Sequence, residues 1–179
     1  MLTIVVPQCE YFDEEKSEFI HTKECTLQLE HSLLSLSKWE SKWGKPFLST
    51  DNKTDEEILD YIRCMTITQN VDPSIYYRLS KENIEKINEY INLPMTATTF
   101  SDKNGPRNTQ IITNEIIYYW MISLNIPFEC QKWHLNRLLT LVKVCSIKNS
   151  PPKKMSKKEI TNRNRALNAS RRKALGSKG

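Results

Sequence analysis

Residues 116–145 read IIYYWMISLNIPFECQKWHLNRLLTLVKVC and form the most apolar stretch of the chain. The first part is apolar on most sides and long enough for a helix that begins near Thr113. Asn125, Ile126 and Pro127 interrupt this helix. A second helix follows, with apolar residues at helical spacing: Trp133, Leu135, Leu138, Leu139, Leu141, Val142 and Cys145. The two helices predict an αα-hairpin at the centre of the fold.

The N-terminus is the part of the chain that favours β-structure. Residues 2–6 (LTIVV) and 19–22 (FIHT) are β-prone, and the acidic residues between them suit a turn. We therefore expect a small hairpin over about residues 2–23. It must pack on the rest of the protein, because an isolated hairpin is only marginally stable in water.

The remaining segments of the first 150 residues predict helices. Leu29, Leu33 and Leu36 lie close to one helical face, and Thr54 with Glu57 forms a capping box. Glycine is scarce, with 4 residues in 179, which disfavours a β-sandwich or barrel. The expected fold class is mostly α. A compact helical domain with the small N-terminal hairpin spans residues 1–150, and a basic C-terminal tail, helical or disordered, spans residues 151–179.

The net charge of +5 conceals two oppositely charged parts. Residues 1–150 carry 16 Lys and Arg against 20 Asp and Glu, whereas residues 151–179 carry 10 Lys and Arg and a single acid, Glu159. Nine of these ten cations are the candidate binding residues of the basic tail: Lys153, Lys154, Lys157, Lys158, Arg163, Arg165, Arg171, Arg172 and Lys173. Such a tail binds nucleic acid, docks on an acidic protein surface, or is simply solvated. The sequence leaves these three alternatives open.

No set of residues points to catalysis, a cofactor or a metal. The five cysteines are widely spaced, and the three histidines do not share zinc-ligand spacing with them. Reduced, structural cysteines are expected. Cys130 and His134 are spaced as a Cys-His pair on a helix, but their segment is apolar and a nucleophilic thiol needs access and a lowered pKa. We therefore expect His134 to lie in the core or at an interface.

The aromatic residues of the apolar stretch are the candidate protein-binding residues: Tyr118, Tyr119, Trp120, Phe128 and Trp133. A base-stacking platform for nucleic acid usually has cations among its rings. Residues 111–131 contain no Lys or Arg. The cluster is therefore expected to form the core or to contact an apolar partner, and the sequence does not separate these two roles.

The overall pattern resembles a family of small proteins from tailed bacteriophages, the tail assembly chaperones. The segments that carry the resemblance are residues 116–145 quoted above, the tail from PPKKMSKKEI onwards, LEHSLLSLSKWESKWGKPFL and PMTATTF. The resemblance implies a non-enzymatic protein that binds the tape measure protein and tail-tube subunits during virion morphogenesis. It also implies a location in the host cell cytoplasm, with the virion as the alternative.

Two other classes remain open beside the chaperone. The first is a virion structural protein, a head–tail connector or minor capsid component, whose basic tail contacts DNA or neighbouring subunits. The second is a DNA-binding regulator that uses the 111–145 hairpin, which is disfavoured because its second helix offers few base-reading side chains. A homo-oligomer and nucleic acid bound through the tail are further open partners. No membrane partner is expected, because no apolar run approaches 18 residues.

Overall fold

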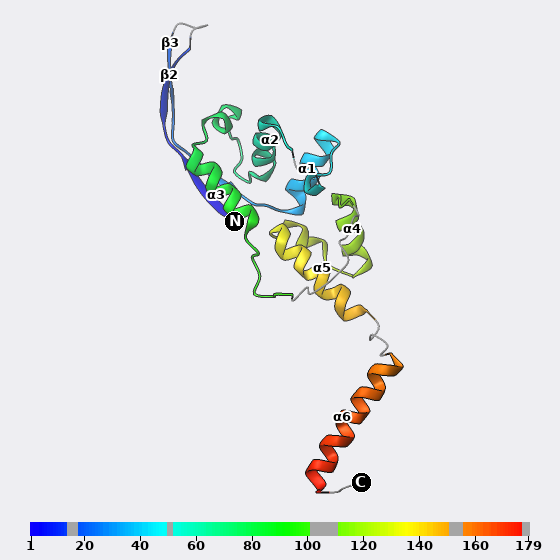
Figure 1. Ribbon diagram of the computed structural model, residues 1–179. Helices are drawn as coiled ribbons and strands as arrows, with labels where there is room; N and C mark the ends of the chain where they lie inside the picture. The colour runs from blue at the N-terminus through cyan, green and yellow to red at the C-terminus, as the bar shows by residue number, and fades with distance from the viewer. Residues whose placement is uncertain (14–17, 50–51, 101–110, 151–155, 177–179) are drawn as a thin grey trace. The chain divides into compact units, whose positions relative to one another are not determined.

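The computed structural model describes residues 1–13, 18–49, 52–100, 111–150 and 156–176. The chain is mostly helical and divides into two compact units, Met1–Ile147 and Lys148–Gly179. Figure 1 shows the elements in chain order, beginning with a two-stranded ribbon at the N-terminus. The expected fold class, mostly α with a small N-terminal antiparallel sheet, is confirmed.

The N-terminal ribbon is longer than predicted and pairs differently. Strand β1 (Leu2–Val6) pairs antiparallel with β4 (Cys25–Leu29), and β2 (Cys9–Asp13) pairs with β3 (Glu18–Thr22). The two ladders share one register and are separated at Pro7, which has no N–H to donate. The prediction that residues 2–6 pair with 19–22, and that Leu29 is helical, is therefore wrong. Alternate residues of β4, Leu27 and Leu29, are buried, as expected of a strand with one face on the core.

A group of helices follows the ribbon and covers its buried face. These are α1 (Leu33–Trp43), η1 (Phe47–Ser49), α2 (Asp55–Met65), η2 (Pro73–Arg78) and α3 (Lys81–Asn92). The predicted capping box of Thr54 and Glu57 opens α2. The first core forms between the ribbon and these helices, with Val6, Leu29 and Trp39 fully buried in it. The indole Nε1 of Trp39 donates to the carbonyl of Glu57 at 2.8 Å, which ties α1 to α2.

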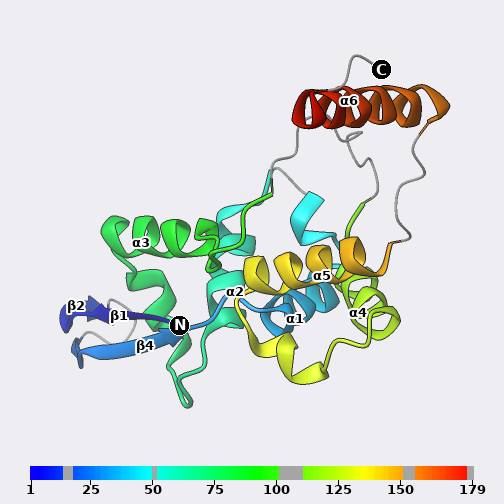
Figure 2. The ribbon, with the colours of Figure 1, turned by 90° about the horizontal axis from the view of Figure 1, so that it is seen from below.

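The apolar stretch forms a second core with α1. It contains α4 (Asn114–Ser123), η3 (Phe128–Lys132) and α5 (Leu135–Asn149), so the predicted start of the helix near Thr113 and its interruption at residues 125–127 are confirmed. Leu33 and Leu36 of α1 pack among Ile117, Met121 and Leu138. Figure 2 shows α1, α4 and α5 gathered at one end of the first unit. The helix α1 contributes to both cores, and it is thus α1, more than the predicted αα-hairpin, that joins the unit together.

The second unit contains the helix α6 (Lys157–Leu175). A capping box of Ser156 and Glu159 opens it, and Gly176 ends it in the left-handed conformation at φ 62°. Every residue of α6 is exposed. The fold of this helix therefore depends on its caps and its helix propensity, with no buried face of its own to stabilise it.

Candidate functional site

The five aromatic residues predicted to bind protein separate into two groups. Tyr119 is 66% exposed and Phe128 is 52% exposed. Tyr118, Trp120 and Trp133 are half-buried and pack on the second core. The structure thus separates core from surface among the five: two rings are presented to solvent, and the other three are partly buried against the second core.

Ile122, which the sequence analysis did not select, belongs with the exposed rings. It is 60% exposed and lies one helical turn from both Tyr118 and Tyr119. The ring of Tyr118 lies against that of Phe128, with centroids 6.4 Å apart, and its hydroxyl donates to Gln131 Oε1 at 2.9 Å. We call Tyr118, Tyr119, Ile122 and Phe128 the α4 patch. Helical spacing from Tyr119 was the signal that would have identified Ile122.

Buried side chains hold the α4 patch on a fixed support. Ile117 and Met121, on the opposite side of α4, are fully buried. The carboxylate of Glu40, which is 7% exposed, accepts the backbone N–H of Asn114 and its side-chain amide, both at 2.7 Å. It also accepts the backbone N–H of Phe47 at 2.8 Å. A negative charge at the N-terminus of α4 complements the helix dipole, so Glu40 fixes α4 to α1 and to η1.

The charges beside the α4 patch are acidic. Glu115 lies one turn before Tyr118 and Tyr119, Glu129 follows Phe128, and both are exposed. A hydrogen bond with the Thr113 side chain is the main cause that lowers the pKa of Glu115, so this carboxylate is ionised at neutral pH. The patch therefore combines apolar rings with a negative rim.

Trp133 has a different environment from the other rings. The guanidinium of Arg137 lies 4.0 Å from its ring centroid, a cation–π contact on the outer side of α5. Together with its packing on the second core, this contact makes Trp133 a supporting residue of the fold.

The Cys130 and His134 pair has no features of a catalytic dyad. Cys130 is 5% exposed, and burial raises the pKa of its thiol, the opposite of what a nucleophile needs. His134 is buried too, with Nε2 3.0 Å from the carbonyl of Tyr90. Its ring lies 5.1 Å from that of His31, whose Nδ1 is 2.6 Å from the hydroxyl of Tyr61. All five cysteines are free thiols.

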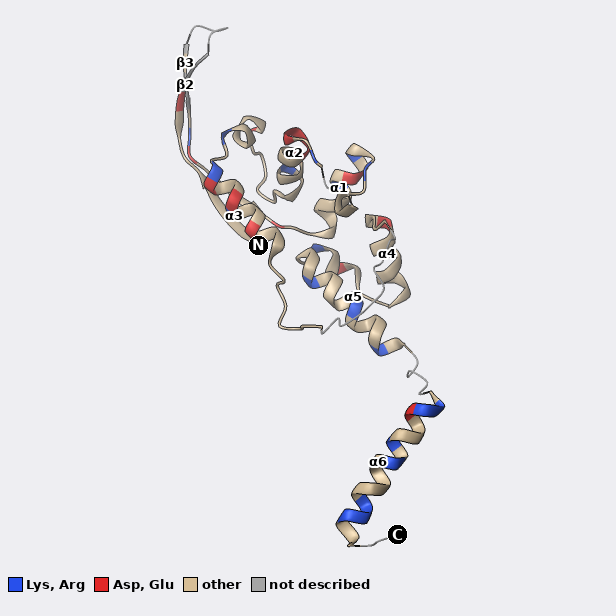
Figure 3. Ribbon diagram, viewed as in Figure 1, with Lys and Arg blue, Asp and Glu red and all other residues tan. Residues whose placement is uncertain are grey.

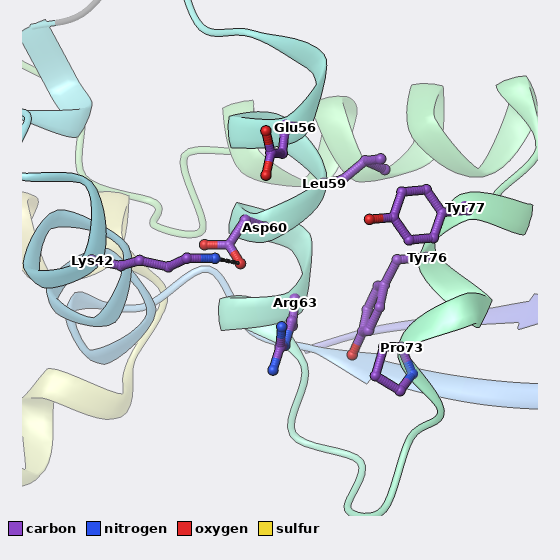
Figure 4. A pocket seen from close by; sticks show the side chains of 8 residues that line it. All are labelled: Lys42, Glu56, Leu59, Asp60, Arg63, Pro73, Tyr76 and Tyr77. Atoms are coloured by element: carbon purple, nitrogen blue, oxygen red, sulfur yellow. Dashed lines mark hydrogen bonds and ion pairs between the residues drawn. The ribbon is translucent and has the colours of Figure 1, made fainter.

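A shallow pocket of about 170 Å³ lies between α1, α2 and η2 (Figure 4). The side chains that line it are Lys42, Glu56, Leu59, Asp60, Arg63, Pro73, Tyr76 and Tyr77. Lys42 Nζ contacts Asp60 Oδ1 at 2.6 Å, and the indole of Trp43 donates to Asp60 Oδ2 at 2.9 Å. Both oxygens of this carboxylate are therefore engaged in holding α1 against α2, which is a structural role.

The residues of the predicted basic tail lie on α6 with two exceptions. Lys157, Lys158, Arg163, Arg165, Arg171, Arg172 and Lys173 are all exposed on this helix. Lys153 and Lys154 lie outside the described residues. Figure 3 shows the cations along the whole length of α6 and one acid in its first turn.

Comparison with known proteins gives no relative: no family model matches the chain, no curated protein is significantly similar to it, and no solved structure matches its fold. Within the described ranges, none of the helices has the length and apolar character needed to cross a membrane. In the same part of the chain, no three His, Cys, Asp or Glu side chains group as metal ligands would.

Proposed function

We propose that this protein is a tail assembly chaperone of a tailed bacteriophage, which binds the tape measure protein and tail-tube subunits in the host cytoplasm without catalysing a reaction. The observation that carries the proposal is the α4 patch, in which Tyr119, Ile122 and Phe128 are each more than half exposed. The resemblance of residues 116–145 and of the tail to this family supplies the phage context.

The chemistry of the α4 patch suits a reversible interaction with an amphipathic helix. Its rings and Ile122 offer an apolar surface to a client that would otherwise aggregate. The acidic rim at Glu115 and Glu129 favours clients with Lys or Arg beside their apolar positions. A patch of a few side chains supports weak binding, which allows the client to be released as the tail assembles.

Co-expression tests this proposal directly. The tape measure and tail-tube proteins of the same phage are expressed with and without this protein, and their soluble fractions and pull-downs are compared. We expect the wild type to keep the tape measure protein soluble and Tyr119→Ser/Phe128→Ser to lose this activity. The matched control is Tyr77→Ser, which removes a ring that is 78% exposed on η2, away from the α4 patch.

Two outcomes would contradict the proposal: the first refutes the chaperone role, and the second refutes client binding at the α4 patch. One is an unchanged soluble fraction with the wild type present. The other is equal loss with Tyr77→Ser, which would show that the effect is not specific to the α4 patch. Circular dichroism of each variant confirms that the helices are intact.

The second candidate function is a virion structural component whose tail contacts DNA or a neighbouring subunit. The observation that favours it is α6, an exposed helix with seven cations and one acid. Mass spectrometry of purified virions separates the two candidates, because a chaperone is absent from the particle and a structural component is present at a fixed copy number. Deletion of residues 151–179 would then impair incorporation.

A further inference from the structure

The cations of α6 are not spread evenly around the helix. Residues seven apart lie almost in line along an α-helix, so Lys158, Arg165 and Arg172 form one row. Lys157 and Lys173 flank this row on its two sides, within half of the circumference. We call these five residues the basic face. Glu159, the one acid of the helix, lies outside it.

The side opposite the basic face has another character. Ile160, Leu167 and Ala174, again seven apart, form a narrow apolar row there. Arg163 and Arg171 lie at the borders of this apolar row, not on the basic face. The helix therefore has two distinct sides, and the charge is concentrated on one of them.

The polar residues among the cations indicate the kind of polyanion. Asn162 and Asn168 lie on the basic face, between the central row of cations and the flanking Lys173 and Lys157. Arg and Asn are the side chains that make paired hydrogen bonds to guanine and adenine edges in the major groove of DNA. The helix is about 28 Å long, and a helix about 10–12 Å across fits the major groove, which is about 12 Å wide.

Other anionic surfaces suit α6 less well. A membrane-surface helix needs a broad apolar side with large or aromatic residues, but the apolar row has only Ile160 and Leu167 as large side chains. A protein partner usually buries apolar residues at the centre of its interface, whereas the centre of the basic face is Arg165. The deep, narrow major groove of duplex RNA does not admit side chains for base reading.

We propose that α6 binds duplex DNA by placing its basic face in the major groove, where the five Lys and Arg side chains of this face neutralise phosphates. The proposal concerns a helix separate from the α4 patch. It does not depend on the chaperone role, and the two can fail independently.

Fluorescence anisotropy of the full chain with a labelled duplex of about 20 base pairs tests the proposal. Five phosphate contacts predict that log K falls with log salt with a slope of about −4.5. Arg165→Gln/Arg172→Gln removes two cations from the basic face. It should reduce the magnitude of the slope by about 2 and weaken DNA binding about tenfold or more at 0.1 M salt. The matched control, Arg163→Gln/Arg171→Gln, removes the same charge from the other side of the same helix and should lose much less.

The same assay gives the results that would overturn the proposal. Equal losses in the two double variants would show that only the net charge of α6 matters. Duplex RNA or single-stranded DNA of the same length binding as tightly as duplex DNA would exclude the major groove. Binding to vesicles with anionic lipid but not to DNA would assign α6 to a membrane surface. Helicity and thermal unfolding of each variant are measured beside binding, and since α6 has no buried residue, both should match the wild type.

Discussion

Lowering the pH should destabilise the first unit through its buried histidines, at a higher pH than that at which its carboxylates are protonated. His31 is 2% exposed, and burial together with the nearby His134 lowers its pKa from 6.5 to about 3. The pKa of His134 is lowered as well, mainly by burial. The charge of Glu30 acts on the pKa of His134 in the opposite direction, but this carboxylate also accepts the hydroxyl of Tyr90 at 2.6 Å and pairs with the N-terminal amine at 3.0 Å.

The sign and size of the effect follow from linkage. The unfolded chain binds the His31 proton near pH 6.5, and the folded chain does not bind it until about pH 3. The free energy of unfolding therefore falls as the pH drops below 6.5. At about pH 5 the loss from His31 is roughly 2 kcal/mol, one and a half pH units at about 1.36 kcal/mol each. His134 changes stability in the same direction.

Urea unfolding followed by circular dichroism at about pH 7.5, 6 and 5 measures this loss. The comparison variant is His31→Gln, which keeps a polar partner for the Tyr61 hydroxyl and cannot titrate. It should be less stable at neutral pH but lose about 2 kcal/mol less than the wild type between pH 7.5 and 5. Hydrogen bonds from Lys45 and from the Ser74 backbone are the main causes that lower the pKa values of Glu57 and Asp72. These two carboxylates therefore lose their contributions to the free energy of unfolding only at a pH below the range of this experiment.

Two results would contradict this prediction: a loss of stability of less than about 0.5 kcal/mol in the wild type over this range, or the same pH dependence in His31→Gln as in the wild type. The first result would mean that the folded protein accommodates a charged imidazole at this position. The second would place the titrating group elsewhere.

Four further substitutions test the contacts and the burial described above. Glu40→Gln turns an amide N–H₂ towards the donors of Asn114 or Phe47 and should cost about 1–3 kcal/mol in urea unfolding; a cost near zero would mean that the carboxylate does not hold α4. Gly44→Ala should cost about 1 kcal/mol from backbone strain alone, because φ is 62° and nothing lies within 4 Å of the added Cβ; an unchanged thermal midpoint would contradict this. Met121→Ala should cost about 2–5 kcal/mol and its neighbour Ile122→Ala less than about 0.5, because the first is fully buried and the second 60% exposed; similar losses would place Ile122 in the core.

Local signals in the sequence were enough to predict where several of the helices begin and end. The start of α4 near Thr113, the interruption at residues 125–127 and the capping box of Thr54 and Glu57 were predicted and are present. Each depends on residues within a few positions of one another. The hydrogen bonds that define such features are local, so sequence spacing is sufficient to identify them.

The ribbon shows why the rest could not be predicted in the same way. Leu29 fits a helical face with Leu33 and Leu36 as well as it fits the alternation of Cys25–Leu29. Its pairing with Leu2 decides between them, and these residues are 27 positions apart. The sequence predicts a short hairpin of residues 2–6 and 19–22, whereas the structure pairs β2 with β3 and continues beyond Pro7 with the pairing of β1 and β4.

The exposed residues of the candidate site could be identified only from the tertiary structure, for a related reason. The helix α4 is apolar on most sides, so its sequence pattern does not identify the side that faces α1. Packing of Leu33 and Leu36 against Ile117 and Met121 selects that side. Tyr119 and Ile122 are exposed as a consequence.

The two proposed surfaces differ in their physical chemistry, and salt therefore distinguishes them within one protein. Binding at the α4 patch depends on apolar burial, which kosmotropic salts such as sulfate strengthen. Binding at the basic face depends on phosphate neutralisation, which every added salt weakens. A titration with ammonium sulfate should thus release DNA from α6 while client binding at the α4 patch persists. If both activities fell together, a single charged surface would have to serve both ligands. The acidic rim at Glu115 and Glu129 and the absence of Lys and Arg from residues 111–131 argue against such a surface.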